Sequence, residues 1–182
     1  MSNFPLHTIE SAPEKSKPVL RALQKTFGFI PNVAAAMAES PVLINGFIGV
    51  FENVHAGSFT EAQIQTLLLT NAVTNACPWA VAFHTALALK QGLDPADVQA
   101  IRERRVPIDA KHAALSTLAK RLIEKRGRLD EGDVQAFFAA GFSSEHVLEV
   151  ITVVAASTIT NYAGNVASPP LEEAFAVHAW SA

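Results

Sequence analysis

The sequence predicts an all-α protein, and three observations support this prediction. Apolar residues recur at helical spacing behind recognisable helix N-caps along most of the 182 residues. No alternating segment bounded by hairpin turns occurs, as half-buried strands would require. Hydrophobic residues make up 49% of the chain and charged residues only 17%, so long uncharged segments are available for a helical core.

The chain begins with a polar, proline-containing stretch over residues 1–18, which we expect to form an N-terminal arm lying over the fold or over a neighbour. Residues 19–182 are expected to form one all-α domain, a common size for a single core. Its first helix is predicted over residues 19–27 and ends at Gly28. A turn then leads into a second helix that ends at about Glu39.

Two strong start signals follow. Ser40 is an N-cap followed by proline at the first helical position, which predicts a helix over residues 41–55. Residues 60–63 read Thr-Glu-Ala-Gln, a capping box that opens an apolar helix. That helix must end or bend before Pro78, because proline lacks a backbone N–H.

A new helix is predicted to start at Pro78 and to run to Gln91, where Gly92 stops it. Further helical segments are expected from Asp94-Pro95 onward, over 109–126, over 130–140, over 143–163 and, as a short last helix, over 170–179.

Two of these segments resemble each other. Residues 93–101 and 129–137 each begin with Leu-Asp and contain Asp-Val-Gln-Ala. The match is compatible with an internal helical repeat. It is equally compatible with convergence, because short capped helices favour acidic residues in the first turn.

Composition excludes several classes of function. The net charge of −3 argues against an extended basic surface for nucleic acid. A single cysteine, Cys77, allows neither an intramolecular disulfide nor a cysteine zinc cluster. No phosphate-binding glycine loop, metalloprotease motif or acidic metal cluster occurs, so no cofactor and no metal are expected. The first residues lack the pattern of a signal peptide, and a cytoplasmic location is therefore expected.

Two uncharged stretches, residues 62–89 and 150–171, are long enough to cross a bilayer. Both contain asparagine and proline, and neither holds about 18 consecutive apolar residues. We therefore expect core helices and no membrane partner. The low charge content further predicts a homo-oligomer (dimer, trimer or hexamer), in which part of the surface is buried.

Cys77 is the residue with the clearest chemical potential. If Pro78 begins a helix, Cys77 lies at the helix N-terminus, a setting that favours the thiolate. His84 follows two helical turns later on nearly the same face, where it could serve as a base or proton shuttle. The alternative is an inert, buried cysteine and a core histidine that bonds within the protein.

Four segments together resemble the carboxymuconolactone decarboxylase / AhpD-like superfamily, close to its peroxidase-related branch. They are residues 28–32 (Gly-Phe-Ile-Pro-Asn), 40–41 (Ser-Pro), 59–60 (Phe-Thr) and 75–84 (Asn-Ala-Cys-Pro-Trp-Ala-Val-Ala-Phe-His). The resemblance covers about residues 20–165 and implies an all-α, homo-oligomeric helical bundle. It also implies a peroxidase motif, Cys-x-x-Cys-x-x-x-His, with a helix-borne glutamate twelve residues before the first cysteine.

The motif is incomplete in this chain. Cys77 and His84 match the first cysteine and the histidine, whereas Ala80 and Gln65 occupy the positions of the second cysteine and the glutamate. The resemblance thus implies Cys77, His84 and Gln65 as catalytic residues.

The first function expected is a thiol oxidoreductase that acts on hydroperoxides with one cysteine and is recycled by an external thiol reductant. A lyase acting on small carboxylated lactones through His84 is the second. A non-catalytic scaffold or small-ligand binder of the same fold is the third. Two neighbouring residues are also candidates: His55, expected to be solvated rather than in the pocket, and Trp79, expected to pack in the core rather than to wall a pocket.

Overall fold

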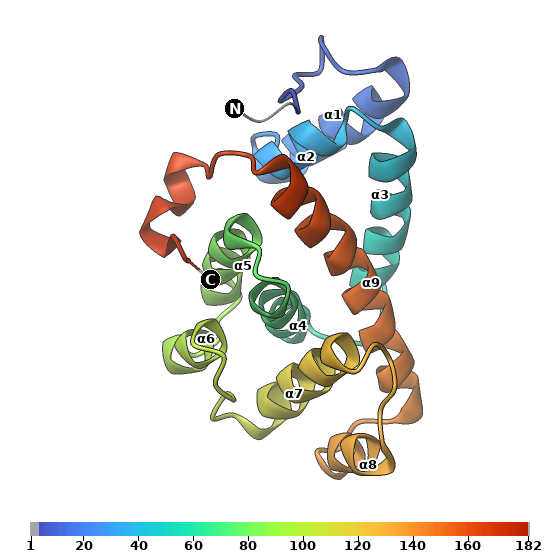
Figure 1. Cartoon of the computed structure of the whole chain (residues 1–182), viewed down its shortest axis with the longest axis vertical. Helices are drawn as coiled ribbons and strands as arrows, with labels where there is room; N and C mark the ends of the chain where they lie inside the picture. Colours follow the sequence, from blue (N-terminus) through green and yellow to red (C-terminus); the bar gives the residue numbers. More distant parts are fainter. Residues whose placement is uncertain (1–3, 182) are drawn as a thin grey trace.

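The computed structural model describes residues 4–181, which form nine α-helices and two 3₁₀ helices and contain no strand (Figure 1). The all-α prediction is confirmed. The elements are η1 (Glu14–Ser16), α1 (Lys17–Phe27), α2 (Asn32–Met37), α3 (Pro41–His55), α4 (Glu61–Thr74), α5 (Pro78–Lys90), α6 (Pro95–Arg102), α7 (Ala110–Glu124), α8 (Glu131–Ala139), α9 (Ser144–Ala167) and η2 (Glu173–His178).

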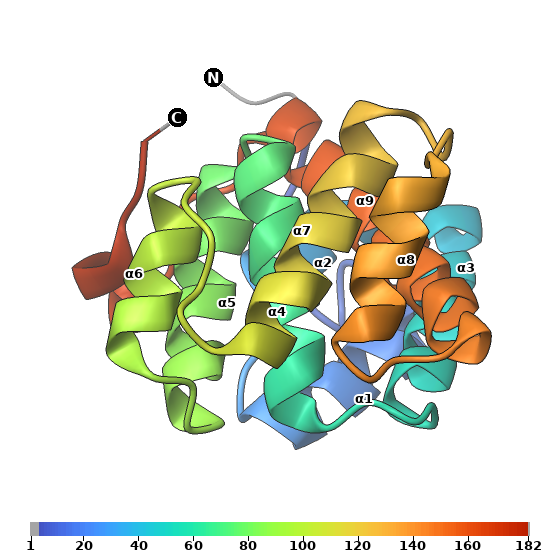
Figure 2. The same cartoon turned by 90° about the horizontal axis from the view of Figure 1, so that it is seen from below.

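Helix α4 lies at the centre of the fold, bordered by α5, α7 and α9 (Figure 1). Ten consecutive residues of α4, from Ile64 to Val73, are buried. A helix that is covered all round needs apolar residues on every face, which explains why this segment contains no charge. Figure 2 shows the other helices grouped around it, with α5 and α6 on one side, α7 and α8 on the other, and α1 and α2 behind.

The predicted helix starts are confirmed by their caps. The Ser40 hydroxyl accepts a hydrogen bond from the Leu43 N–H, and Pro41 is the first residue of α3. Thr60 and Gln63 form the reciprocal capping box that begins α4.

Two predicted boundaries need correction at the C-terminal end. The segment predicted as an α-helix over 170–179 is instead the 3₁₀ helix η2. Helix α9 continues past residue 163 to Ala167 and ends at Ser168, which adopts a left-handed conformation (φ 46°). The glycine at position 164, which costs helix propensity, is retained inside α9 because a side chain has no room there, as described below.

The expected N-terminal arm lies partly outside the described residues, since residues 1–3 are not among them. Where it is described, the backbone N–H of His7 donates to the carbonyl of Ala35, and the Ser16 hydroxyl donates to the carbonyl of Ala38. The segment is therefore bound to α2 and the residue that follows it. The division of the chain into an arm (residues 1–18) and a domain (residues 19–182) stays a prediction.

The two similar segments become α6 and α8, and Asp94 and Asp130 cap them as expected. The second aspartates differ in role. Asp97 is buried and accepts hydrogen bonds from the backbone N–H of Ile108 and Asp109, whereas Asp133 pairs with Lys125. The internal repeat stays a prediction.

Helix α9 alone, among the described residues, is long and apolar enough to cross a membrane by length and composition. Only 39% of its most apolar 18-residue window is buried inside the protein. A cytoplasmic location stays a prediction.

Candidate active site

Helix α5 begins as the sequence predicts, with Cys77 as N-cap and Pro78 as first residue. The Cys77 side chain is completely buried against α9, where a Cβ placed on Gly164 would lie 2.8 Å from its sulfur. Burial raises the pKa of the Cys77 thiol, and the backbone N–H groups of Trp79 and Ala80 oppose this effect only in part. Cys77 does lie at the helix N-terminus, but the rise in thiol pKa caused by desolvation is larger than the lowering caused by the N–H groups there.

Two of the three expected catalytic residues meet. Gln65 on α4 and His84 on α5 are both buried, and Nδ1 of His84 lies 3.0 Å from Oε1 of Gln65. The amide oxygen can only accept, so Nδ1–H donates and Nε2 keeps its lone pair. Gln65 thereby orients the ring and fixes its tautomer.

His84 is a neutral imidazole in this environment. Burial lowers its pKa from 6.5 to about 3, and the nearby His55 adds a smaller effect in the same direction. A ring with so low a pKa is a weak base, so Nε2 offers a hydrogen-bond acceptor and takes up a proton only where a bound molecule raises the pKa.

Two cavities adjoin at His84. The outer one has a volume of about 590 Å³ and is also lined by Gln65, His55 and Glu61. The inner one, about 60 Å³, lies beyond it and is also bordered by Trp79. Their shared walls are mostly apolar and are formed by Leu23, Phe27, Phe51, Phe83 and His84. A volume of this order suits a small, largely apolar ligand.

At the mouth of the outer cavity a second histidine, His55, pairs with a glutamate. Nδ1 of His55 lies 2.9 Å from a carboxylate oxygen of Glu61. His55 is exposed to solvent, as expected, and its ring also lines the outer cavity from the end of α3. Glu61 was missed, although its position four residues before Gln65 places both on one face of α4.

Cys77 does not join this group. It lines neither cavity, and none of the hydrogen bonds described for residues 4–181 connects it to His84. Seven residues of helix separate the two positions by about 10 Å along the axis, which is too far for direct proton transfer. Ala80, at the position of the second cysteine, is likewise completely buried.

Trp79 serves both of the roles considered for it. Its ring stacks on Phe83 with the centroids 4.9 Å apart, and it borders the inner cavity. Its Nε1–H donates to Glu172, whose other carboxylate oxygen accepts from the backbone N–H of Asn32. Glu172 thus ties the segment after α9 to α2 and α5. No sequence signal indicated this, since the partners are 140 and 93 residues away.

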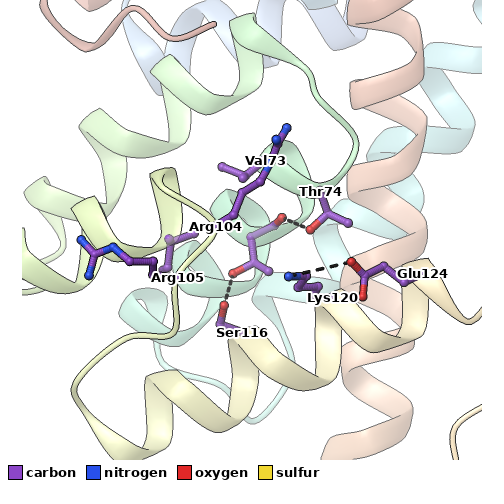
Figure 3. A pocket seen from close by; sticks show the side chains of 9 residues that line it. Val73, Thr74, Arg104, Arg105, Ser116, Lys120 and Glu124 are labelled. Carbon is purple, nitrogen blue, oxygen red and sulfur yellow. Dashed lines mark hydrogen bonds and ion pairs between the residues drawn. The ribbon is translucent and has the colours of Figure 1, made fainter. Parts of the chain in front are cut away.

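A third cavity, of about 320 Å³, lies between α4, α6 and α7 and holds none of the expected site residues (Figure 3). Its floor is a hydroxyl pair in which Thr70 donates to Ser116 at 2.9 Å. Arg105 points away from it (Figure 3), and Lys120 lies 3.8 Å from Glu124. Within the described part of the chain, no group of three or more histidine, cysteine or acidic residues could hold a metal ion.

Comparison with known proteins agrees with this architecture. Residues 41–122, which span α3 to most of α7, match the model of the carboxymuconolactone decarboxylase family. No curated protein matches the sequence.

Several solved structures share the fold. An uncharacterized peroxidase-related protein from Ralstonia eutropha JMP134, described as an alkylhydroperoxidase AhpD core, is 18% identical over 96% of this chain and 94% of its own, with a TM-score of 0.84. A peroxidase-related protein from Silicibacter sp. TM1040 is 17% identical over 95% and 92%, with a TM-score of 0.78. A cysteine-to-alanine variant of the debrominase Bmp8, in complex with 2,3,4-tribromopyrrole, is 18% identical over 98% and 97%, with a TM-score of 0.76.

At these identities the structures establish the fold and no specific activity. The resemblance seen in the sequence is nevertheless confirmed, both by the family match and by the arrangement of the helices. The segment 41–122, which carries Gln65, Cys77 and His84, matches the model of the carboxymuconolactone decarboxylase family, and the chain has the fold of an AhpD-like helical bundle.

Proposed function

We propose that this chain is an enzyme in which His84 transfers a proton to or from a small carboxylated molecule bound in the outer cavity. The observation that carries the proposal is the hydrogen bond from His84 to Gln65 at the junction of the two cavities. It fixes an imidazole beside a space large enough for a substrate, as proton transfer requires.

The low pKa of His84 favours an anionic substrate. With a pKa of about 3 the empty site is a poor acid at neutral pH. A carboxylate placed beside the ring stabilises the imidazolium and raises that pKa toward its ordinary value. The histidine would then exchange protons only when a suitable substrate is bound. Lys90 lines the outer cavity and attracts the same charge, whereas Glu52 and Glu61, which line it too, oppose this attraction.

A decarboxylation illustrates the chemistry. The bond between the substrate carbon and its carboxylate breaks, CO₂ leaves, and the electron pair passes into a conjugated carbonyl group. The protonated His84 then delivers its proton to the carbon, and solvent restores that proton. Gln65 keeps the ring in place throughout and is a positioning residue.

The test is an assay of unsaturated γ-lactones that carry one carboxylate, with CO₂ release and deuterium uptake from D₂O as readouts. We expect turnover by the wild type and a loss of at least about 100-fold in His84→Gln, the usual scale of acid–base catalysis. His178→Gln, which changes a histidine outside both cavities, is the matched control. Equal rates for His84→Gln and the wild type would refute the proposal.

A second candidate is the hydroperoxide reaction of Cys77. The N–H groups of Trp79 and Ala80 near its sulfur and the AhpD-like fold favour it. In this reaction the thiolate attacks the peroxide oxygen, giving a sulfenic acid and an alcohol, and two equivalents of an external thiol restore the cysteine with release of water and a disulfide.

Peroxide consumption with a dithiol reductant separates the two candidates. If Cys77 is the nucleophile, the wild type is active and Cys77→Ser is not, whereas His84→Gln abolishes only the lactone reaction. If Ala80 and Gln65 are what blocks a family-type cycle, Ala80→Cys combined with Gln65→Glu gains more activity than the two single variants together. An inactive double variant that still forms the Cys77 disulfide would favour a non-catalytic binder of the same fold.

A further inference from the structure

We infer that the third cavity, between α4, α6 and α7, binds a small organic acid through its carboxylate group. This cavity is separate from the site at His84, because it shares no lining residue with the outer and inner cavities. Its lining brings two cationic side chains, Arg104 and Lys120, together with the buried hydroxyl pair of Thr70 and Ser116 (Figure 3).

The hydroxyl pair has one proton to spare. Thr70 is 4% exposed and Ser116 is 7% exposed, and the hydrogen bond between them uses only one of the two hydroxyl protons. In the part of the chain that the structure describes, neither hydroxyl donates to a backbone carbonyl, whereas Thr66 and Thr74 on the same face of α4 both do. A buried donor without an acceptor costs free energy, so this floor favours a ligand that brings an acceptor oxygen.

Arg104 supplies a positive charge that the protein orients without neutralising it. Its guanidinium lies 5.6 Å from the centre of the Trp180 ring, and the indole N–H of Trp180 donates to the carbonyl of Arg102 at 3.0 Å. An aromatic ring attracts a guanidinium through its face and leaves the N–H groups free to donate. No carboxylate among residues 4–181 forms an ion pair with Arg104, which is exposed and can be reached from solvent.

The turn after α6 separates Arg104 from the arginine next to it. The N–H of Arg104 donates to the carbonyl of Ile101 and that of Arg105 to the carbonyl of Ala100, which is the bond pattern of a Schellman turn, with Arg104 in the left-handed conformation (φ 62°). Arg105 turns away from the cavity and pairs with Glu103 (Figure 3). Arg104 is therefore the arginine available to a ligand.

Lys120 adds a second positive charge from α7. Its Nζ lies 3.8 Å from Oε1 of Glu124, an ion pair that is too long for a hydrogen bond. In Figure 3 the ammonium lies on the cavity side of Glu124. Two cations and one carboxylate leave one positive charge in the lining, which matches a singly charged carboxylate better than a doubly charged phosphate.

The size of the cavity and its remaining walls define the rest of the ligand. A volume of about 320 Å³ lies at the lower end of the range for small-molecule pockets. Val73 and Ile101 add apolar walls beside the polar groups. The cavity therefore suits a carboxylate on a short apolar chain, whose oxygens accept from the Arg104 guanidinium and from the spare hydroxyl proton of the Thr70–Ser116 pair.

The test is a titration of the ¹⁵N-labelled full chain with butyrate and with butyramide, its uncharged isostere, followed through the backbone amide chemical shifts. We expect saturable shifts at Arg104 and Ser116 with butyrate and none with butyramide, because only butyrate carries the charge that the lining attracts. The amides of Gln65 and His84 report on the outer cavity, so binding at the two places is measured separately and either can fail without the other.

Matched variants assign the binding to named side chains. Arg104→Asn should weaken butyrate binding by at least about tenfold, since a charge-assisted hydrogen bond is lost, and asparagine tolerates the left-handed conformation. Arg105→Asn removes the same charge from the next residue and should change the affinity by less than about twofold, because exposed charges are screened. Ser116→Ala should weaken binding by about two- to tenfold, the range for a neutral hydrogen bond. Unchanged amide shifts elsewhere in the chain show that each variant is folded.

Four results would overturn the inference. Absence of saturable shifts at Arg104 and Ser116 up to about 50 mM butyrate, well above the millimolar range of weak small-molecule binding, would remove the site. Equal binding of butyramide would mean that the cavity recognises only the apolar chain. Equal losses in Arg104→Asn and Arg105→Asn would reduce the effect to general attraction by surface charge. Tighter binding of inorganic phosphate than of butyrate at the same amides would assign the cavity to phosphate groups instead.

Discussion

Gly164 and Cys77 lie so close that a single methyl group on the glycine would come within 2.8 Å of the sulfur. The Cys77 side chain is completely buried, so the sulfur has no access to solvent. The contact joins α9 to the start of α5 and fixes how closely these two helices approach. Because the contact is so close, substitutions at the two residues test it directly.

Gly164→Ala should destabilise the protein by about 1–3 kcal/mol, the usual cost of overpacking a core. On a Cys77→Ala background the same change should be neutral or should stabilise by up to about 1 kcal/mol, because alanine is the better helix former and the sulfur is gone. Urea unfolding of the four proteins measures this coupling. Equal costs on the two backgrounds would show that the contact does not limit the packing.

The buried His84 should make stability depend on pH. Its folded pKa of about 3 lies below the unfolded value of 6.5, so the unfolded chain binds more protons between these values. Stability should therefore be unaffected by this residue above pH 6.5 and fall as the pH drops below it, by ~1.4 kcal/mol per pH unit down to about pH 3.

Urea unfolding at pH 7.5, 6.0 and 5.0 tests this dependence. His84→Gln should show a shallower slope than the wild type, whereas His178→Gln should keep the wild-type slope. Identical slopes for the wild type and His84→Gln would mean that the ring is not held neutral.

The Cys77 thiol should react slowly in the folded protein. Burial raises its pKa and covers the sulfur, so both thiolate fraction and access are low. We expect modification by an aromatic disulfide reagent at pH 7.5 to be at least about tenfold slower than in the urea-unfolded chain, and to be still accelerating at pH 9. A folded-state reaction that reaches its plateau below pH 8 would instead indicate an activated thiol and would favour the hydroperoxide candidate.

Glu172→Gln should weaken the attachment of the segment after α9. The carboxylate accepts from the Asn32 backbone at 2.6 Å and from the Trp79 indole at 2.8 Å, and an amide can accept through one oxygen only. We expect a loss of about 1–2 kcal/mol in the free energy of unfolding and a changed Trp79 fluorescence. The exposed neighbour provides the comparison: Glu173→Gln should change stability by less than about 0.5 kcal/mol.

The helices were predictable because their signals are local. Ser40, Thr60 and Pro78 each belong to a helix-start signal of at most four residues. All three predicted starts are confirmed. The meeting of His84 with Gln65 followed from the family resemblance rather than from spacing. The separation of Cys77 from this pair was not predictable, since it depends on how closely α9 approaches α5 at Gly164.

The residues missed at the site differ in whether the sequence holds a local signal for them. Glu61 could have been found, because it lies one helical turn before Gln65. Glu172 and the apolar wall from α1 and α3 reach the site across large sequence separations, and a single sequence holds no local signal for such contacts.

The two contacts of Glu172 also bear on how the protein is made. A ribosome releases residues 32 and 79 long before residue 172, so the first helices must remain partly uncovered until residue 172 has been synthesised. Loop closure over such a distance is slow compared with the formation of a local helix turn. The nascent chain therefore exposes Trp79 and its aromatic neighbours until residue 172 emerges, and chaperones can bind this apolar surface throughout that interval.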